Sequence, residues 1–374
     1  MRALSIAVTT AVSFVALTQI VPAADMPIKA PPAAAATQAG GFYVWADGSY
    51  QSVKLPKFGL GLRNVDPVAL TDRGVVDTFD PRATGFGVRG AVGYVFAPGT
   101  FAPMFGSDVR FEIGASYINV DDKSSGGTTF VPTFAGGISL LNGTTFPSAS
   151  YFSINCATGA FNCSTSAALE TNYRSWQVDG KLASDYKMGA FKLTPSVAVF
   201  GGNSRNNQSF AQAFAQRDPT GLLFNSITYN SGTSLDWTDV GARAGLDAQF
   251  SVNTWLSIGA GGYVGFAHRS ASLSGSDSTA YGLFGPIAAA TSSVAASADK
   301  TALVANAEAN VTINVTPRAA LRAFVGLNYD DSVPGISSPT FTGPFNGATS
   351  VTPAGILFQK ETSYYAGGGA LVRF

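Results

Sequence analysis

The sequence predicts an all-β protein that crosses a membrane as an antiparallel up-and-down β-barrel. Apolar and polar residues alternate along many separate stretches, and strands place successive side chains on opposite faces. Hydrophobic residues make up 46% of the chain but charged residues only 12%, about half of what soluble proteins carry. A soluble β-sandwich also alternates, but it would show more charge on its outer faces. Long alternating strands with few charges are typical of a barrel surrounded by lipid.

The last stretch of the chain, ETSYYAGGGALVRF from Glu361 to Phe374, shows the pattern most clearly. One alternating set is apolar and consists of Tyr364, Ala366, Gly368, Ala370, Val372 and Phe374. The other set mixes small and polar residues and contains Arg373. The first set is expected to face lipid and the second the barrel interior.

Nine further stretches repeat the alternation, which makes ten expected strands in all. They lie near residues 42–51, 86–96, 109–116, 173–182, 191–199, 239–250, 257–266, 303–314 and 321–330. Pro195 lies inside one of them and predicts a bulge or local irregularity there. The segment TTFVPTFAGGISLL, between Asp122 and Ala167, could add another hairpin and raise the number of strands to twelve.

The connections between these stretches alternate in length. Short ones lie near 98–106, 184–189, 251–254 and 315–318, and long ones near 55–82, 123–167, 203–234, 270–300 and 332–360. Outer-membrane barrels have short turns on the periplasmic rim and long loops outside the cell. We therefore expect short periplasmic turns, long extracellular loops and both chain ends on the periplasmic side.

The domain organisation is expected to be simple. Residues 1–23 read as a secretory signal peptide, with Arg2 before an apolar run and a small-residue cleavage site near Ala23. Residues 24–40 are rich in Ala and Pro and predict a flexible periplasmic leader. The barrel would then occupy residues 41–374.

Two motifs at opposite ends of the chain resemble a known family. The leader AADMPIKAPP and the C-terminal strand ending in Phe374 resemble those of porin-like outer-membrane β-barrels of alphaproteobacteria. The resemblance implies the bacterial outer membrane as location, with outer-membrane lipid and lipopolysaccharide as neighbours. It also implies that the barrel-assembly machinery recognises the C-terminal strand.

Charge and cysteine content exclude several kinds of partner. Lys plus Arg and Asp plus Glu number 23 each, so no strong field attracts nucleic acid and none is expected as a partner. Cys156 and Cys163 lie close together in a small-residue segment and are expected to form a disulfide in this exported chain. Two thiols and the single His268 do not make a zinc site, so neither metals nor other cofactors are expected.

The interior register collects most of the charged residues. Those expected to line the lumen are Asp47, Arg89, Arg110, Glu112, Asp179, Lys181, Lys192, Arg243, Asp247, Glu308, Arg322 and Asp330, with Glu361 and Arg373 in the last strand. Charges kept from bulk water need partners. Such an interior is either an ion-paired filling that holds the barrel shut or a small aqueous pore with weak charge selectivity.

The function expected first is that of a porin-like channel for passive diffusion of small hydrophilic solutes through a narrow, nearly charge-balanced lumen. The long loops could fold inward and form a constriction. The alternative is a non-conducting structural or surface-interaction barrel with recognition in its loops. The sequence leaves open whether the chain forms a homo-oligomer.

A remote enzymatic alternative rests on Ser270, His268 and Asp236. The first two share the lipid-facing register, and pairing Ala248 with Ile258 would place Asp236 opposite Ser270. The His-x-Ser spacing resembles that of outer-membrane phospholipase A and lipid A deacylase. The chain departs from the phospholipase pattern at Ala271, where that family has Asn for the oxyanion, so no enzyme is expected.

A different expectation for the same strand is an interfacial role. His268 and Arg269 are expected to lie with Arg174 and Lys54 near the outer rim. There, basic side chains can contact lipopolysaccharide phosphates.

Overall fold

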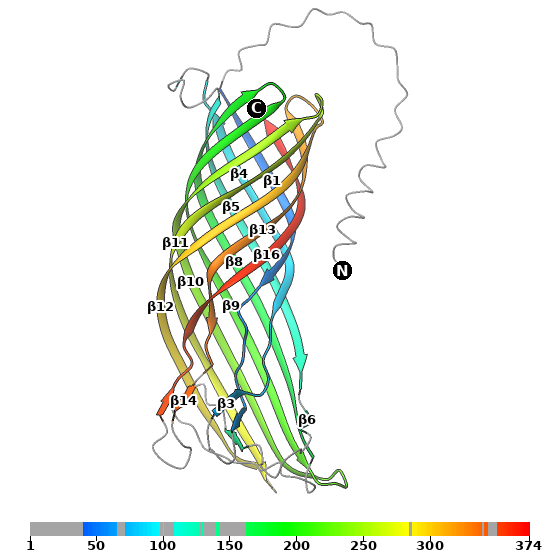
Figure 1. The fold of residues 1–374 in the computed structure, drawn as a ribbon, viewed down its shortest axis with the longest axis vertical. Coiled ribbons are helices and arrows are strands. Elements are labelled where there is room, and N and C mark those ends of the chain that lie inside the picture. The colour runs from blue at the N-terminus through cyan, green and yellow to red at the C-terminus, as the bar shows by residue number, and fades with distance from the viewer. Residues whose placement is uncertain are drawn as a thin grey trace, which may run out of the picture.

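The computed structural model is a closed, elongated β-barrel (Figure 1). It describes residues 40–65, 72–97, 100, 108–127, 129–130, 139–141, 162–283, 286–338, 340–342 and 350–374. The expected signal peptide and all of the leader except Gly40 lie outside these residues. Among the described residues, no helix is long and apolar enough to span a bilayer.

Ten antiparallel strands form the ring. They are β1 (Gly41–Lys54), β4 (Arg82–Val95), β5 (Asp108–Gly126), β8 (Asn162–Met188), β9 (Phe191–Arg217), β10 (Leu223–Ser251), β11 (Leu256–Leu283), β12 (Pro286–Asn314), β13 (Ala319–Ile336) and β16 (Ile356–Arg373). Each pairs with the next along the chain, and β16 closes the ring by pairing with both β13 and β1. The prediction of an up-and-down barrel is confirmed.

The alternative of twelve strands is wrong. Within the segment proposed as an extra hairpin, β6 (Thr129–Phe130) pairs with β8, and β7 (Ser139–Leu141) pairs with β2 (Arg63–Val65). A third short strand, β3 (Asp72–Val75), completes the small sheet around β2, and β14 (Thr340–Thr342) pairs with β15 (Ser350–Thr352). All of these short strands lie at one end of the barrel (Figure 1). Strand β6 adds to the barrel sheet along β8, whereas β2, β3, β7, β14 and β15 belong to two separate small sheets.

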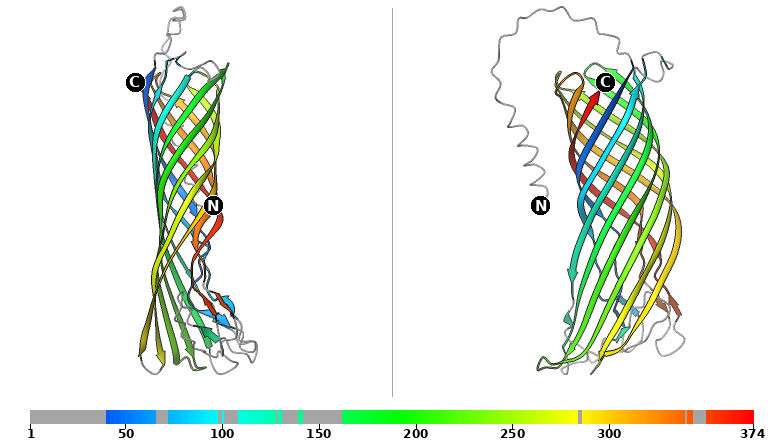
Figure 2. Two further views of the ribbon diagram at one scale, coloured as in Figure 1. Left: turned by 90° about the vertical axis from the view of Figure 1, so that its left-hand side faces the viewer. Right: turned by 180° about the vertical axis from the view of Figure 1, so that it is seen from behind.

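Two of the five expected loops are not loops. Strands β9 and β10 continue the wall through 203–234 as a long hairpin with a turn at 218–222, and β11 and β12 continue it through 270–283 and 286–300. Strands β9 to β12 therefore extend well past the ends of β1 and β4 (Figures 1 and 2). The described short turns β8–β9, β10–β11 and β12–β13 lie at the opposite end, together with the C-terminus (Figure 1).

An apolar belt surrounds the part of the barrel near the short turns. Its outward side chains are exposed and apolar on every strand, as Val199 on β9 and Val240 on β10 illustrate. From Val240 to Phe250 the strand advances roughly 34 Å at about 3.4 Å per residue, or roughly 26 Å of height at a tilt of about 40°. That height matches the roughly 25 Å apolar band of outer-membrane barrels. The protein is thus a bacterial outer-membrane β-barrel whose short turns are periplasmic.

Beyond the belt the distribution of apolar residues is inverted. The outward residues of β10 become small and polar, while Ile227, Tyr229, Leu235 and Trp237 point inward and are buried. The interior of this extracellular extension therefore holds apolar side chains together with buried polar ones such as Gln208, Gln212 and Thr233, while its exterior faces water.

We call the main interior cluster of this extension the apolar plug. It brings together residues of β8 to β11 and β13 with residues of the connections between β1 and β4 and between β13 and β16. Each is at most 7% exposed, and its members are Phe58, Leu60, Phe79, Ala167, Leu169, Phe210, Tyr229, Leu235, Trp237, Ala271, Leu273, Ile336 and Ala354. The hydrophobic core of the protein thus lies above the membrane.

Pro195 produces a smaller irregularity than expected. Strand β9 keeps its register with β10 across Pro195, which faces Leu246. On the other side, the ladder with β8 skips Ser184 and Asp185 before it resumes. Proline has no N–H to donate, which accounts for a lapse in one ladder without a bulge.

Candidate functional site

The candidate site is a cavity of about 590 Å³ inside the membrane-spanning part of the barrel. It reaches from Arg373 at the periplasmic rim to Tyr173 and Trp237 at the base of the apolar plug. All twelve charged residues expected in the lumen line this cavity, as do Glu361 and Arg373. Strand alternation alone places them there, because each belongs to the set opposite the lipid-facing residues.

The lining is almost electrically neutral. Nine basic residues line the cavity, Lys54, Arg89, Arg110, Lys181, Lys192, Arg243, Arg269, Arg322 and Arg373. Eight acidic residues face them, Asp47, Glu112, Asp179, Asp239, Asp247, Glu308, Asp330 and Glu361. This balance permits no strong preference for ions of either sign.

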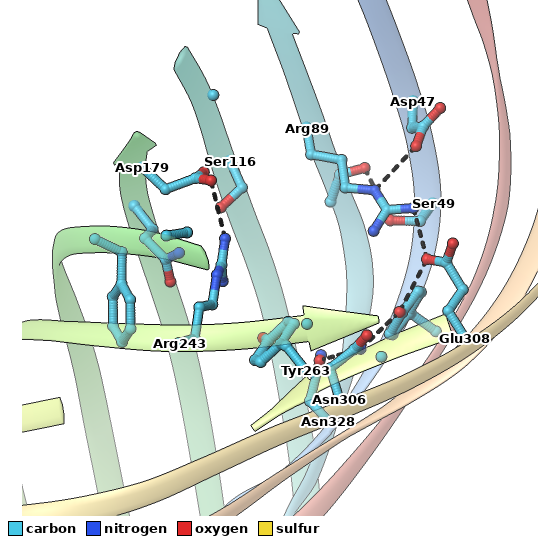
Figure 3. Close-up of a pocket in the computed structure, with 18 of the residues that line it drawn as sticks. Asp47, Ser49, Arg89, Ser116, Asp179, Arg243, Tyr263, Asn306, Glu308 and Asn328 are labelled. Carbon is cyan, nitrogen blue, oxygen red and sulfur yellow. Dashed lines mark hydrogen bonds and ion pairs between the residues drawn. The ribbon is translucent and has the colours of Figure 1, made fainter. Parts of the chain in front are cut away.

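The largest charged cluster among the described residues is a closed quartet of side chains from β1, β4, β12 and β13. Arg89 on β4 contacts Asp47 on β1 at 3.0 Å and Glu308 on β12 at 2.7 Å (Figure 3). Arg322 on β13 binds the same two carboxylates. Both guanidinium groups also lie over the ring of Phe324, at 4.4 Å and 5.3 Å from its centroid. Alternating charges and a shared aromatic ring hold these side chains in place rather than leaving them free for solutes.

Two further clusters tie other parts of the wall together. Glu112 on β5 accepts hydrogen bonds from the Tyr43 hydroxyl at 2.8 Å and the Trp45 indole at 3.1 Å, and pairs with Lys181 at 3.6 Å. Arg243 on β10 pairs with Asp179 on β8 at 3.0 Å (Figure 3) and lies over the ring of Tyr263 at 4.5 Å. The contacts of Glu112 with Tyr43 and Trp45, and of Arg243 with Asp179, bridge strands that are not hydrogen-bonded to each other.

Asp185 belongs to this interior and was missed at the sequence level. Its carboxylate lies 3.8 Å from Arg110 and 3.6 Å from Lys192, and accepts a hydrogen bond from Thr194 at 2.7 Å. The sequence analysis assigned 184–189 to a turn, whereas β8 continues to Met188. Continuing the alternation from Asp179 and Lys181 would have placed Asp185 on the same face.

The expected position of Arg269 beside His268 near the outer rim is wrong. Arg269 is 3% exposed and points into the barrel, between the charged cavity and the apolar plug. It binds Asp239 at 2.7 Å and 2.9 Å, Asp330 at 3.1 Å and 2.8 Å, and the Ser332 carbonyl at 2.6 Å. Side chains alternate along β11, and Phe266 and His268 point outward. The alternation therefore predicts that Arg269 points inward, in conflict with the expected role at the rim.

Above Arg269 the interior is filled by the apolar plug. A chain segment that packs against the inward side chains of β9 and β10, Leu55 to Leu62, supplies four almost fully buried side chains, Leu55, Phe58, Leu60 and Leu62. The Leu62 amide donates to Gln212 Oε1 at 2.8 Å, and Gly61 before it has a φ of 86°. A side chain at Gly61 would collide with Gln212, so glycine is required both for the backbone shape and for the close approach.

The proposed catalytic triad is not assembled. His268 and Ser270 face outward as expected, but Asp236 pairs with Ser272, whereas Ser270 pairs with Thr238 and His268 with Val240. The register differs by two residues from the expected one, because Ala248 pairs with Ala260 rather than Ile258. Asp236 also forms an ion pair with Arg205. The carboxylate is therefore too far along the strand to orient His268.

Little in the described residues points to a bound metal. No group of three or more His, Cys, Asp or Glu side chains there is arranged to hold a metal ion. Cys163, at the start of β8, is disulfide-bonded, and its expected partner Cys156 lies outside the described residues.

Comparisons with known proteins give distant structural likenesses. No protein-family model matches the chain, and no curated protein matches it. The outer membrane protease OmpT from Escherichia coli is 12% identical, with 89% of this chain and 97% of that chain covered and a TM-score of 0.38. The deltaS2 mutant of the monoaromatic hydrocarbon channel TodX is 8% identical (91% of each chain, TM-score 0.24), as is a FadL homologue of Pseudomonas aeruginosa (89% and 90%, TM-score 0.23). At these scores the likeness carries no information about function.

Proposed function

We propose that this outer-membrane barrel is closed to passive diffusion and acts as a structural and interaction scaffold at the cell surface. The observation that carries the proposal is the apolar plug, which occupies the barrel interior between the charged cavity and the cell exterior. Hydrophobic constrictions exclude water and ions even where they are not completely packed. The proposal includes no catalytic step.

The ion-paired cavity supports the same function. Arg89, Arg322 and Arg269 each contact two carboxylates at once. Moving such a group aside for a passing solute would leave a charge uncompensated in a poorly hydrated interior, which is costly. The cavity therefore serves to hold the barrel wall together.

The outer face of the extracellular extension offers the interaction surface. On β11 its outward residues are Ser270, Ser272, Ser274, Ser276 and Ser278, and β9 and β10 add Asn, Ser, Thr, Gly and Ala. From Thr238 to Leu223, β10 continues for roughly 50 Å at about 3.4 Å per residue. The extension therefore presents a rigid surface of small, mostly polar side chains above the membrane, where partners can reach it.

Conductance across a planar bilayer tests the proposal. The wild-type barrel should give no single-channel steps, whereas the double variant Phe58→Ser with Leu60→Ser should hydrate the plug and give intermittent steps. Leu222→Ser is the matched control, because this leucine is 71% exposed at the tip of the β9–β10 hairpin. Regular steps from folded wild-type protein would overturn the closed barrel.

The second candidate is the porin-like channel, which the size and near neutrality of the cavity favour. If wild-type protein conducts, small solutes pass through this cavity and the lining charges set selectivity. Neutralising Arg110 or Arg243 should then shift selectivity toward cations, measured as a change in reversal potential. An unchanged reversal potential would remove these arginines from the conducting path.

A further inference from the structure

Two arginines face each other directly on the outer surface of the barrel. Arg174 on β8 and Arg205 on β9 are cross-strand partners, and both side chains are exposed. Like charges in directly opposite positions destabilise a sheet. Arg205 is compensated by Asp236 on β10, but none of the ion pairs among the described residues includes Arg174. The row carries a net positive charge that an anion would complement.

This row lies at the upper edge of the apolar belt. One step below it, Tyr117 on β5 and Trp176 on β8 are neighbouring outward residues and remain exposed. Exposed Trp and Tyr mark the interface between hydrocarbon and headgroups in outer-membrane barrels. Because the long hairpins are extracellular, the arginines lie at the headgroup level of the outer leaflet.

A lipid-facing groove lies on the same strands, on the periplasmic side of the two arginines. It has a volume of about 590 Å³, and small residues such as Gly180, Ala242 and Ala244 line it together with larger apolar ones such as Phe111 and Phe266. From Val199 in the groove to Arg205, β9 advances roughly 20 Å at about 3.4 Å per residue. At a tilt of about 40° this places the groove roughly 15 Å below the arginines, within the apolar band.

We propose that this face is a specific binding site for a phosphorylated glycolipid of the outer leaflet, of the lipid A type. Arg174 and Arg205 bind a phosphate group through charge-assisted hydrogen bonds, which are roughly twice as strong as neutral ones. An acyl chain of the same molecule occupies the groove over Ala242 and Ala244. The site assigns the expected contact with lipopolysaccharide to specific residues. It does not depend on whether the barrel conducts.

Native mass spectrometry of the purified barrel in detergent tests the site. With diphosphorylated lipid A as probe, wild-type protein should retain one molecule at much lower lipid concentration than the double variant Arg174→Ala with Arg205→Ala. Each lost charge-assisted bond should weaken retention about tenfold. Arg318→Ala is the matched control, because it removes an exposed arginine at the periplasmic turn and should leave retention unchanged.

A second variant separates the groove from the charges. Ala242→Leu with Ala244→Leu fills the groove with apolar atoms on a lipid-facing surface, so folding is retained while the acyl chain is displaced. Retention of lipid A should fall although both arginines are present. Equal retention by wild type, the arginine variant and the groove variant would overturn the proposal.

Two further lipids identify the chemistry that is recognised. Dephosphorylated lipid A should be retained as weakly by wild type as diphosphorylated lipid A is by the arginine variant. Phosphatidylglycerol should be retained less well than lipid A because it offers one phosphate and two chains. Retention of phosphatidylglycerol equal to that of lipid A would show general anion binding and overturn specific recognition of the glycolipid.

Discussion

At the scale of single residues, Arg269 is the most completely bonded side chain of the interior. Its guanidinium group binds two carboxylates and a backbone carbonyl, and it lies 6.0 Å from the centre of the Trp237 ring. Arg269 lies on β11, and its partners come from β10 on one side and from β13 on the other, beyond β12. Arg269 therefore ties four strands together where the charged cavity meets the plug.

Replacing Arg269 by leucine should strongly destabilise the barrel. Asp239 and Asp330 would then face each other in the interior without a cation, and breaking one side of a buried pair costs about 3 to 5 kcal/mol. The free energy of unfolding in urea, followed for the barrel in lipid vesicles, measures the effect. The triple variant that adds Asp239→Asn and Asp330→Asn should recover part of the loss. A value for Arg269→Leu equal to wild type would contradict this role.

At the scale of elements, the β9–β10 hairpin shows how a long extension ends in a defined turn. Asp218 accepts hydrogen bonds from the Thr220 hydroxyl at 2.7 Å and from the amides of Thr220 at 2.9 Å and Leu222 at 2.8 Å. Gly221 has a φ of 90°, which other residues rarely adopt. The Thr220 hydroxyl, followed by the backbone amides, lowers the pKa of the Asp218 carboxyl.

The turn should therefore loosen only in acid. A lowered folded-state pKa means that the contribution of Asp218 is present above the unfolded value of about 3.9 and is lost as pH falls through the folded value. In the barrel in micelles, the amide NMR shifts of Thr220 and Leu222 should titrate together with a midpoint below about 3.9. In Asp218→Ala this transition should disappear, and a midpoint at or above about 3.9 in wild type would refute the assignment.

At the scale of the whole molecule, the protein consists of two stacked zones with opposite polarity. The membrane zone is apolar outside and charged inside, and the extracellular zone is polar outside and encloses the apolar plug together with buried polar side chains. Strands β8 to β12 pass through both zones, and the register between neighbouring strands is continuous at the boundary between the zones. The bilayer therefore determines which face of the same strand must be apolar.

An arginine scan along one strand tests where the membrane lies. Val197→Arg on β9 puts a charge near the middle of the belt and should cost about 2 to 4 kcal/mol of folding free energy in lipid. Ala213→Arg, which is also outward on β9 but lies in the extracellular extension, should change it by less than about 0.5 kcal/mol. Urea unfolding from vesicles compares the two. Equal costs would contradict the placement of the belt.

The alternation of the chain predicted much of the candidate site. Because inward and outward residues follow strictly from parity, all twelve expected lumen residues line the cavity, although the alternation could not show which of them bind each other. The quartet of Arg89, Asp47, Arg322 and Glu308 joins residues far apart in the sequence, so it depends on ring closure. The register of β10 and β11, and with it the failure of the triad, also needed the pairing itself.

The sequence by itself determined that the chain forms an antiparallel up-and-down barrel and which residues of its membrane belt face lipid, because both depend on local period-two patterning. It left ten or twelve strands open, and the pairings of β16 with β13 and β1 decide this in favour of a ring of ten. Only the tertiary structure showed that β9 to β12 continue as wall through most of 203–234 and 270–300 and that the segment 55–62 packs against the inward side chains of β9 and β10. On β10 the apolar side chains point inward up to Trp237 and outward from Val240 onward. A search for apolar residues at every second position therefore loses the strand at this point. Packing across the barrel joins segments more than a hundred residues apart, and no local pattern contains that information.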